Sequence, residues 1–468
     1  MITTSEMERR LARTPWWARP RDWIRDDPDL RGARDSSFDY TAGVLRDLVP
    51  GGLYLLRGPR RVGKSVEVKK TIQRLIEGGE DPRRILHVAA DNLSAPDLRK
   101  MVDASTAVTR TEGPRFWFLD EITAITGGWP AEIKWLRDND PRFSADTVVL
   151  TGSSATGLDE AIKALAGRRG GALDSDRVLL PMPFRDFLRL TRRGPPEADF
   201  RPWPVAQVTR DALTTAARDL APWLDDMVRG WEDYLVVGGF PRSVDAYIRN
   251  ADDEAFRGEL LDVVHGEALR RAQWSKSRTD AFVRRLARGL GAPANRADIA
   301  TDIGGSAILV RNRINALRDA FTVWPCYRER DLRPHLRAQE KVYLLDPVFA
   351  RLTRYPQPGL DRGILSEQQL GIALLRALER ARPGAFLDFD AVLHHRTQTR
   401  KEIDFVGPHF GDAAIEAKYV SGHRWRRAIP TIRASRWRGI VATRDALDLR
   451  DPEVVAVPAG LLVWLIGG

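Results

Sequence analysis

The eight residues GPRRVGKS, Gly58 to Ser65, constrain the fold of this chain more than any other stretch. They match the spacing G-x-x-x-x-G-K-[ST], in which glycines let backbone N–H groups approach phosphate oxygens. An apolar run, LYLL, precedes them, and the amphipathic stretch SVEVKKTIQRLIEG follows. The order strand, loop, helix aims the N–H groups of the first helical turn at a bound phosphate. The sequence therefore predicts a nucleotide-binding α/β domain around this loop.

Every residue of the loop is a predicted nucleotide contact: Gly58, Pro59, Arg60, Arg61, Val62, Gly63, Lys64 and Ser65. Lys64 can neutralise the β- and γ-phosphates, and Ser65 can bind Mg²⁺. From average residue frequencies the bare pattern arises by chance in about one chain in fifty of this length. The strand and helix around it make chance rarer still, so ATP and Mg²⁺ are the predicted cofactors.

The stretch FWFLDE is predicted to complete the nucleotide site, because its apolar strand ends in Asp120 and Glu121. A carboxylate at such a strand end can complete the magnesium shell, and a neighbouring Glu can polarise the attacking water. Taken alone, an Asp-Glu pair is more often a solvated turn. Paired with the loop at Gly58, the catalytic interpretation is favoured.

Short apolar runs alternate with amphipathic stretches from Leu53 onward, in the pattern of LYLL, RILHVAA, FWFLDE, TVVLTGSS and RVLLPM. This alternation indicates an α/β fold with a mainly parallel sheet covered by helices. A Pro-rich stretch at 192–207 marks a boundary. We expect five segments: a Trp-rich leader packed on the following chain (1–45), the nucleotide-binding core (46–195), a helical region (196–290), a winged helix (291–355) and a small α/β domain (356–468).

The predicted winged helix comes from NRADIATDIGGSAILVRNRINALRDAF, which reads as a short helix, a Gly-Gly turn and a second helix capped by Ser306. Two strand-like runs follow, VWPCYR and KVYLLD. On the second helix an apolar face points to a core, and it is made of Val310, Ile314, Leu317 and Phe321. The other face carries the predicted DNA contacts Arg311, Asn315 and Arg318. The alternative is that this block packs between its neighbours as a protein module.

Charge and cysteine usage bear on partners and compartment. The chain has 74 Lys and Arg against 64 Asp and Glu, a net charge of +10, which suits a nucleic-acid partner; an Arg-rich composition explains the excess equally well. The single Cys326 excludes an intramolecular disulfide and a thiolate zinc cluster and fits a reducing cytoplasm. We expect no signal peptide, no membrane span and a cytoplasmic location. The apolar tail AGLLVWLIGG is predicted to be a last buried strand.

A second phosphate site is predicted near the C-terminus. In DAAIEAKYV a period of two places Glu416 and Lys418 on one face, and in KEIDFV Asp404 points away from the buried Ile403. Two adjacent strands can then bring Asp404 and Glu416 around Mg²⁺ or Mn²⁺, with Lys418 orienting the attacking water or steadying the charge that develops. Glu367, in the first turn of a preceding helix, is the predicted third acid, unless it serves only as a favourable charge at that helix N-terminus.

These motifs together resemble a widespread prokaryotic ATPase family with an AAA-type ATPase domain, a winged helix and a C-terminal restriction-endonuclease-like PD-(D/E)xK domain. The pieces that match are GPRRVGKS, FWFLDE, VVLTGSS, LPMPFRDFL, YLVVGGFPRSV, KVYLLDPVFARL, and KEIDFV with AIEAKY. They span nearly everything from residue 50 onward. The loop departs from many relatives in its basic pair, Arg60 and Arg61, which adds positive charge near the nucleotide.

The resemblance implies further roles. It makes Ser153 the sensor of the γ-phosphate, although small polar residues also end strands as caps. It makes Arg168, in LAGRRGG, a candidate arginine finger toward a neighbouring subunit, although a solvated basic loop explains that residue as well. It also implies nucleotide-dependent assembly into a homo-oligomer, a hexameric ring being one form.

Two functions follow from this sequence. The first is an ATP-dependent DNA-binding and DNA-processing enzyme acting in repair, branch migration or defence, with Asp404, Glu416 and Lys418 as nuclease residues. The second is a nucleotide-switched regulatory or scaffold protein whose nuclease-like fold is inert.

Overall fold

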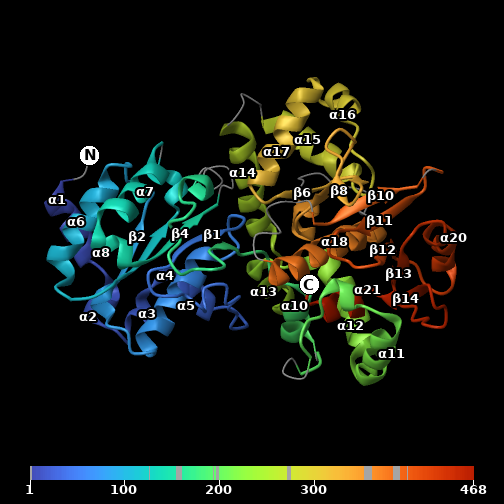
Figure 1. Ribbon diagram of the computed structural model, residues 1–468, viewed down its shortest axis with the longest axis horizontal. Coiled ribbons are helices and arrows are strands. Elements are labelled where there is room, and N and C mark those ends of the chain that lie inside the picture. The colour runs from blue at the N-terminus through green and yellow to red at the C-terminus, as the bar shows by residue number, and fades with distance from the viewer. Residues whose placement is uncertain are drawn as a thin grey trace. The chain divides into compact units, whose positions relative to one another are not determined.

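The computed structural model describes residues 3–125, 127–153, 161–192, 194–196, 200–270, 276–352, 361–382, 391–397 and 399–468 (Figure 1). The chain divides into two compact units, Met1–Leu180 and Pro181–Gly468. The finer five-segment partition stays a prediction. None of the described helices is both long and apolar enough to cross a membrane.

The first unit is built on a five-stranded sheet in the order β2-β3-β4-β1-β5, and every pairing in it is parallel. Its strands are β1 (Leu53–Arg57), β2 (Ile85–Ala89), β3 (Phe116–Asp120), β4 (Thr147–Gly152) and β5 (Asp176–Val178). The connecting helices include α5 (Lys64–Glu77), α6 (Asp97–Thr109), α7 (Trp129–Asn139) and α8 (Pro141–Ala145). The predicted parallel α/β fold is confirmed, since β1 and β4 are buried along their whole length as strands covered on both faces are.

Four short helices precede this sheet: α1 (Thr4–Ala12), α2 (Pro15–Ala18), α3 (Trp23–Asp26) and α4 (Pro28–Arg34). The indoles of Trp16 and Trp17 both donate to the carbonyl of Ile85, at 3.0 and 3.2 Å. On α5 the buried Lys69 donates to Asp27 at 2.8 Å. The Trp-rich leader is therefore packed on the nucleotide-binding core.

The second unit begins with helices α10 (Phe184–Thr191), α11 (Arg210–Asp219), α12 (Leu224–Val237), α13 (Pro241–Ile248), α14 (Glu254–Arg270) and α15 (Lys276–Arg288). Two glycines break the chain between α12 and α13. Gly238 has φ +78°, and a Cβ there would lie 2.0 Å from Oδ1 of Asp346. The N–H of Gly239 donates to the other oxygen of Asp346 at 2.7 Å. A buried carboxylate thus holds the break in place.

A helix-turn-helix follows, formed by α16 (Arg296–Ile303) and α17 (Ala307–Asp319). The side chain of Ser306 accepts from the N–H of Leu309 at 3.2 Å, which confirms the predicted cap. The predicted apolar face is also buried: Val310, Ile314, Leu317 and Phe321. After α17, β6 (Val323–Cys326) pairs antiparallel with β9 (Lys341–Leu344), and the small hairpin of β7 (Glu329–Arg330) and β8 (Arg333–Pro334) lies between them in sequence.

The C-terminal part places α18 (Arg362–Ala381) beside a five-stranded mixed sheet, coloured orange to red in Figure 1. Its strands run in chain order: β10 (Leu393–Arg396), β11 (Glu402–Val406), β12 (Ala413–Lys418), β13 (Arg438–Thr443) and β14 (Val454–Pro458). The first three strands pair antiparallel and the last three parallel.

Two details of this part differ from prediction. The apolar tail is a helix, α21 (Ala459–Ile466), and not a strand. Every residue of α21 is buried, and a continuous apolar run has no period that separates helix from strand. Glu367 lies in the second turn of α18, because the helix starts at Arg362, where Asp361 caps it through the N–H of Gly363.

Candidate functional site

The loop between β1 and α5 has the backbone that phosphate binding requires. Gly58 and Gly63 have φ of +150° and +105°, and a Cβ on Gly58 would lie 2.1 Å from the carbonyl oxygen of Leu179. Only glycine fits at position 58, where the loop packs closely on the backbone of Leu179, whereas a Cβ on Gly63 would meet no atom within 4 Å. The ammonium of Lys64 spans the loop, donating to the carbonyls of Gly58 at 3.0 Å and Pro59 at 2.9 Å. Burial lowers the pKa of Lys64 to about 8.

The carboxylate of Asp120, at the end of β3, faces the loop. Its Oδ2 accepts from the hydroxyl of Ser65 at 2.7 Å, and its Oδ1 accepts from Thr151 at the end of β4. Nε2 of His87, on β2, lies 3.8 Å from Oδ2. Burial alone would raise the pKa of Asp120, but the nearby His87 and the hydrogen bonds from Thr151 and Ser65 hold it below its ordinary value. Sequence reasoning missed His87, whose only signal is its place near the end of a predicted strand.

Glu121 follows directly in a left-handed conformation, with φ +53°. Its Oε1 accepts from the hydroxyls of Ser153 at 2.6 Å and Thr123 at 3.0 Å. Its backbone N–H donates to Thr151 at 3.0 Å. The structure therefore brings four predicted site residues together at the carboxyl ends of β1, β3 and β4: Ser65, Asp120, Glu121 and Ser153. Ser154, the other serine of that strand end, lies outside the described residues.

These residues fit a nucleoside triphosphate with Mg²⁺. The open space at Gly63 suits phosphate oxygens, and the buried ammonium of Lys64 suits their charge. Ser65 and Asp120 supply the hydroxyl and carboxylate oxygens that Mg²⁺ prefers. Arg168 lies at the surface, where it donates to Asp138 on α7 at 2.7 Å.

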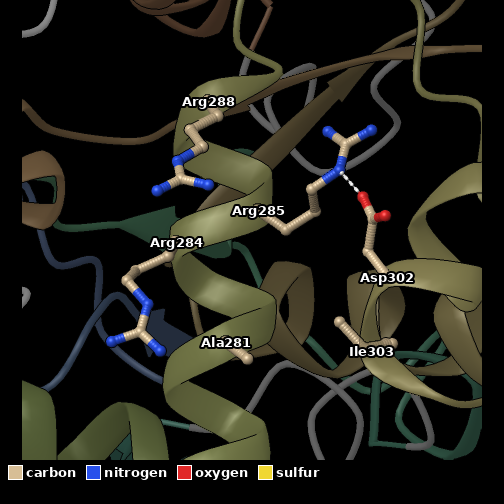
Figure 2. Close-up of a pocket in the computed structure, with 6 residues that line it drawn as sticks. All are labelled: Ala281, Arg284, Arg285, Arg288, Asp302 and Ile303. Carbon is tan, nitrogen blue, oxygen red and sulfur yellow. Dashed lines mark hydrogen bonds and ion pairs between the residues drawn. The ribbon is translucent and has the colours of Figure 1, made fainter.

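On α17, Arg311 is exposed, Asn315 is half-buried, and Arg318 forms an ion pair with Asp319 at 2.9 Å. The neighbouring α15 carries a basic cavity that sequence reasoning missed. It has a volume of about 560 Å³ and is lined by Ala281, Arg284, Arg285, Arg288, Asp302 and Ile303 (Figure 2).

The second predicted site also assembles. Asp404 on β11 and Glu416 on β12 are joined by a hydrogen bond from the N–H of Asp404 to Oε2 of Glu416, at 3.2 Å. Oδ2 of Asp404 accepts from the N–H of Ala417 at 2.9 Å. Oε1 of Glu416 lies 2.6 Å from Nζ of Lys418. The acid and the base of the E-x-K tripeptide are therefore bound to each other.

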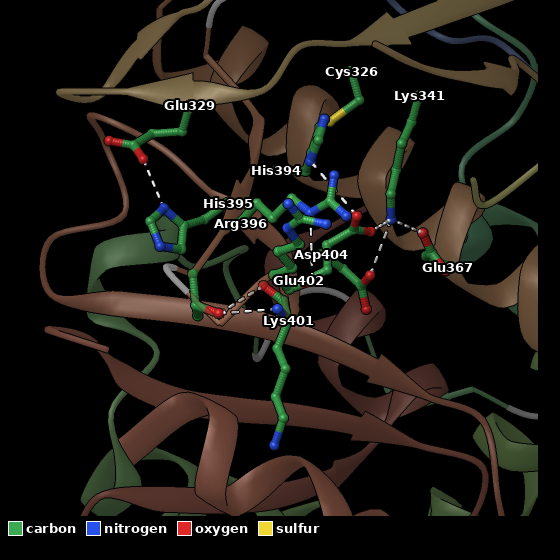
Figure 3. Close-up of polar contacts among 12 residues, drawn as sticks. Cys326, Glu329, Lys341, Glu367, His394, His395, Arg396, Lys401, Glu402 and Asp404 are labelled. Atoms are coloured by element: carbon green, nitrogen blue, oxygen red, sulfur yellow. Dashed lines mark hydrogen bonds and ion pairs between the residues drawn. The ribbon is translucent and has the colours of Figure 1, made fainter. Parts of the chain in front are cut away.

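An unpredicted residue, Lys341 on β9, enters this cluster (Figure 3). Its side chain is 1% exposed, and its Nζ lies 2.8 Å from Oε1 of Glu367 and 3.2 Å from Oδ1 of Asp404. It also forms an ion pair with Glu402. Burial alone would lower the pKa of Lys341, but Tyr343 and these three carboxylates hold it well above its ordinary value. The surrounding carboxylates therefore favour the charged form of the lysine.

Burial alone lowers the pKa of the lysine, but it raises the pKa of the carboxyl groups beside it. It raises the pKa of Glu367 to about 7 and that of Glu416 to about 8, and in both cases the charge of Asp404 adds to the effect. Across the described ranges, no group of three or more His, Cys, Asp or Glu is placed to hold a metal ion. With an ammonium between Glu367 and Asp404, the predicted ligand set as arranged does not fit a divalent metal.

Comparison with known proteins places the first site in a family. Residues 51–188 match the AAA domain family, and residues 228–354 match a domain of unknown function (DUF8612). No curated protein sequence is similar enough to this chain to count as a relative. The first unit thus contains an AAA-type P-loop ATPase domain.

Solved structures with a similar arrangement include a Walker-type ATPase, PABY2304, of Pyrococcus abyssi, at 15% identity over 65% of this chain and 91% of that one, with a TM-score of 0.39. The Aeropyrum pernix ORC1 protein, solved in complex with DNA, matches at 16% over 78% and 98%, with a TM-score of 0.28. A Thermotoga maritima RuvB mutant matches at 14% over 72% and 96%, with a TM-score of 0.29.

Proposed function

We propose that this protein is a Mg²⁺-dependent ATPase that binds and processes DNA. The observation that carries the ATPase assignment is the convergence of Ser65, Asp120 and Glu121 on the loop that holds Lys64. In this proposal Lys64 and the loop backbone bind the triphosphate, while Ser65 and Asp120 hold Mg²⁺. When bound, Mg²⁺ supplies positive charge that offsets the charge developing on the phosphate oxygens.

Glu121 is the proposed base. Ser153 and Thr123 both donate to its Oε1, so they fix the carboxylate and leave Oε2 to orient the attacking water and accept its proton. Ser153 then acts on the reaction through Glu121, which is compatible with a role as γ-phosphate sensor.

DNA binding is proposed for the surface formed by α15 and α17, the two helices that contact α16. Arg311, Asn315 and Arg318 are the proposed contacts on α17, in a winged-helix arrangement with β6 and β9. Figure 2 shows Arg284 and Arg288 on α15 beside Arg285, which reaches Asp302. Arg278 joins α15 to the turn by donating to the carbonyl of Ile303 at 3.0 Å. Guanidinium groups around one cavity suit the phosphates of a DNA backbone.

The test is a charge reversal on this surface. The double variant R288E/R311E changes two exposed arginines, and R218E/R249E is the control with the same charge change on α11 and after α13. We expect the first variant to weaken duplex binding at least tenfold and to flatten the salt dependence of the affinity, because phosphate contacts release counterions. Fluorescence anisotropy at several salt concentrations measures both quantities. Equal losses in the two variants would contradict this surface.

The C-terminal part is proposed to have a PD-(D/E)xK nuclease-like fold, on the order of Glu367, Asp404 and the E-x-K strand. A second function is favoured by one observation, the Lys341 ammonium among these acids. In that alternative the protein is a nucleotide-switched regulator or scaffold whose nuclease-like part does not cleave. A cleavage assay on linear, branched and single-stranded DNA in Mg²⁺ and Mn²⁺ separates the two functions, with D404A and E416A as the comparison.

A further inference from the structure

The acids of the C-terminal sheet are already satisfied by groups of this chain. Asp404 accepts from Lys341 at Oδ1 and from the N–H of Ala417 at Oδ2. Glu416 pairs with Lys418 at Oε1 and accepts from the N–H of Asp404 at Oε2. Each of these four oxygens therefore already has a donor of this chain beside it, and a metal ion would have to share or displace those donors.

The ammonium of Lys341 is equally satisfied. An ammonium has three N–H donors and no acceptor, and Lys341 faces three carboxylates, on Glu367, Glu402 and Asp404. This match replaces the hydration that the group loses on burial, which is what keeps a buried charge tolerable. Figure 3 shows the side chain running from β9 down into these acids.

A divalent ion and this ammonium compete for one position. A group within hydrogen-bonding distance of both Glu367 and Asp404 stands where a bridging cation would have to stand. Two cations at such a short distance in a buried site repel each other strongly, because little water screens their charges. Tyr343, two residues along β9, adds a further donor to Glu367 and occupies more of its Oε1.

The lysine also comes from a different part of the fold than the acids. It opens β9, where it pairs with Cys326 of β6, whereas the carboxylates lie on α18 and β11. The ion cluster therefore ties the β6–β9 pair to the C-terminal sheet.

We propose that the Lys341 ammonium is the resident cation of this carboxylate site, that it takes the place of the divalent metal a PD-(D/E)xK nuclease needs, and that the site joins β9 to the C-terminal sheet. This inference rests on the nuclease-like fold proposed above for the C-terminal part, and it does not depend on ATP hydrolysis or DNA binding.

The experiment measures Mn²⁺ bound per full-length chain, from the loss of the free-ion EPR signal, without nucleotide. Wild type and D404N are expected to bind the same number of ions, because any ion at the P-loop contributes equally to both. K341M removes the ammonium and keeps a side chain of similar length, and we expect it to gain one Mn²⁺ per chain. The double variant K341M/D404N should lose that gain.

Two results would overturn the proposal. One is a wild type that binds one more Mn²⁺ than D404N, since the acids would then hold metal despite the lysine. The other is a folded K341M, shown by circular dichroism, that gains no Mn²⁺. If K341M does not fold, the comparison of wild type with D404N decides alone, and cleavage of DNA by wild type in Mn²⁺, absent from D404N, would also overturn it.

Discussion

Glu121 combines a left-handed backbone with a side chain held by two hydroxyls. A non-glycine residue in that conformation costs of order 1 kcal/mol or more and persists where the surroundings enforce it. Here the N–H of Glu121 donates to Thr151 while its carboxylate meets Ser153, both at the end of β4. The strain is thus coupled to the placement of the proposed base.

We expect Glu121→Gln to bind ATP and to turn it over about 10²- to 10⁴-fold more slowly, because the amide cannot accept the proton of the attacking water. Phosphate release measures turnover, and a fluorescent ATP analogue measures binding. Lys64→Ala is the comparison and should lose binding itself. Full hydrolysis by E121Q would refute the assigned role.

Asp346 predicts a pH dependence of stability. Burial raises the pKa of the Asp346 carboxyl to about 6. Hydrogen bonds from the N–H groups of Gly239 and Val348 act in the opposite direction but are outweighed. The value of this pKa in an unfolded chain is 3.8, so the folded state binds more protons between pH 4 and 6, and stability falls as pH rises through this window. Between pH 4 and 6, the free energy of unfolding of the wild type should decline by about 3 kcal/mol more than that of Asp346→Asn. Urea titrations at each pH measure this difference. Parallel curves for the two proteins would contradict this.

At the scale of elements, the break between α12 and α13 depends on two local glycines and on a carboxylate that is distant in sequence. The glycines are visible in YLVVGGFPRSV, but the carboxylate that holds them comes from the turn after β9. The hydrogen bond therefore ties the break between the two helices to the turn after β9.

Gly238→Ala should lower the free energy of unfolding by about 2 kcal/mol or more, because the new Cβ would meet Asp346 and φ is positive. The matched control is Gly258→Ala in α14, where no heavy atom lies within 4 Å of the new Cβ. Removing a glycine from a helix should stabilise the control by about 0.5–1 kcal/mol. Chemical denaturation compares the two, and equal effects would be inconsistent with the proposed clash.

The parts of the fold that could be predicted from the sequence are those set by residues close together in the chain. The loop at Gly58 and the cap at Ser306 each depend on a few neighbouring residues. The prediction of a strand for the apolar tail was wrong, since the tail forms the helix α21. A uniformly buried segment has no periodicity from which helix and strand can be told apart. Lys341 was missed because its partners Glu367 and Asp404 lie 26 and 63 residues away in sequence, and nothing in KVYLLD marks the lysine as buried.

At the scale of the whole molecule, the remaining question is assembly. Nucleotide-dependent oligomers stay a prediction, and within the chain Arg168 pairs with Asp138. To act as an arginine finger, Arg168 would have to break its exposed ion pair with Asp138. Such exposed pairs contribute little to stability.

Particle mass, measured by light scattering with a non-hydrolysable ATP analogue and DNA, should rise to a multiple of the 52.7 kDa chain. Lys64→Ala should stay at the mass seen without nucleotide, because it cannot bind the analogue. Arg168→Ala should assemble but hydrolyse ATP more slowly. A wild type that remains a single chain under all conditions would exclude a ring and favour the switch.

The tryptophan leader has a practical consequence for dissecting the protein. The AAA match begins at residue 51, yet a fragment cut there would strip the indoles of Trp16 and Trp17 from the carbonyl of Ile85 and Asp27 from the buried Lys69. Lys69 lies on α5, the helix that starts at the phosphate-binding loop. Excision at the family boundary would therefore remove the carboxylate partner of Lys69 and uncover the side of α5 that α4 contacts, so we expect a well-folded ATPase fragment to need the residues before it.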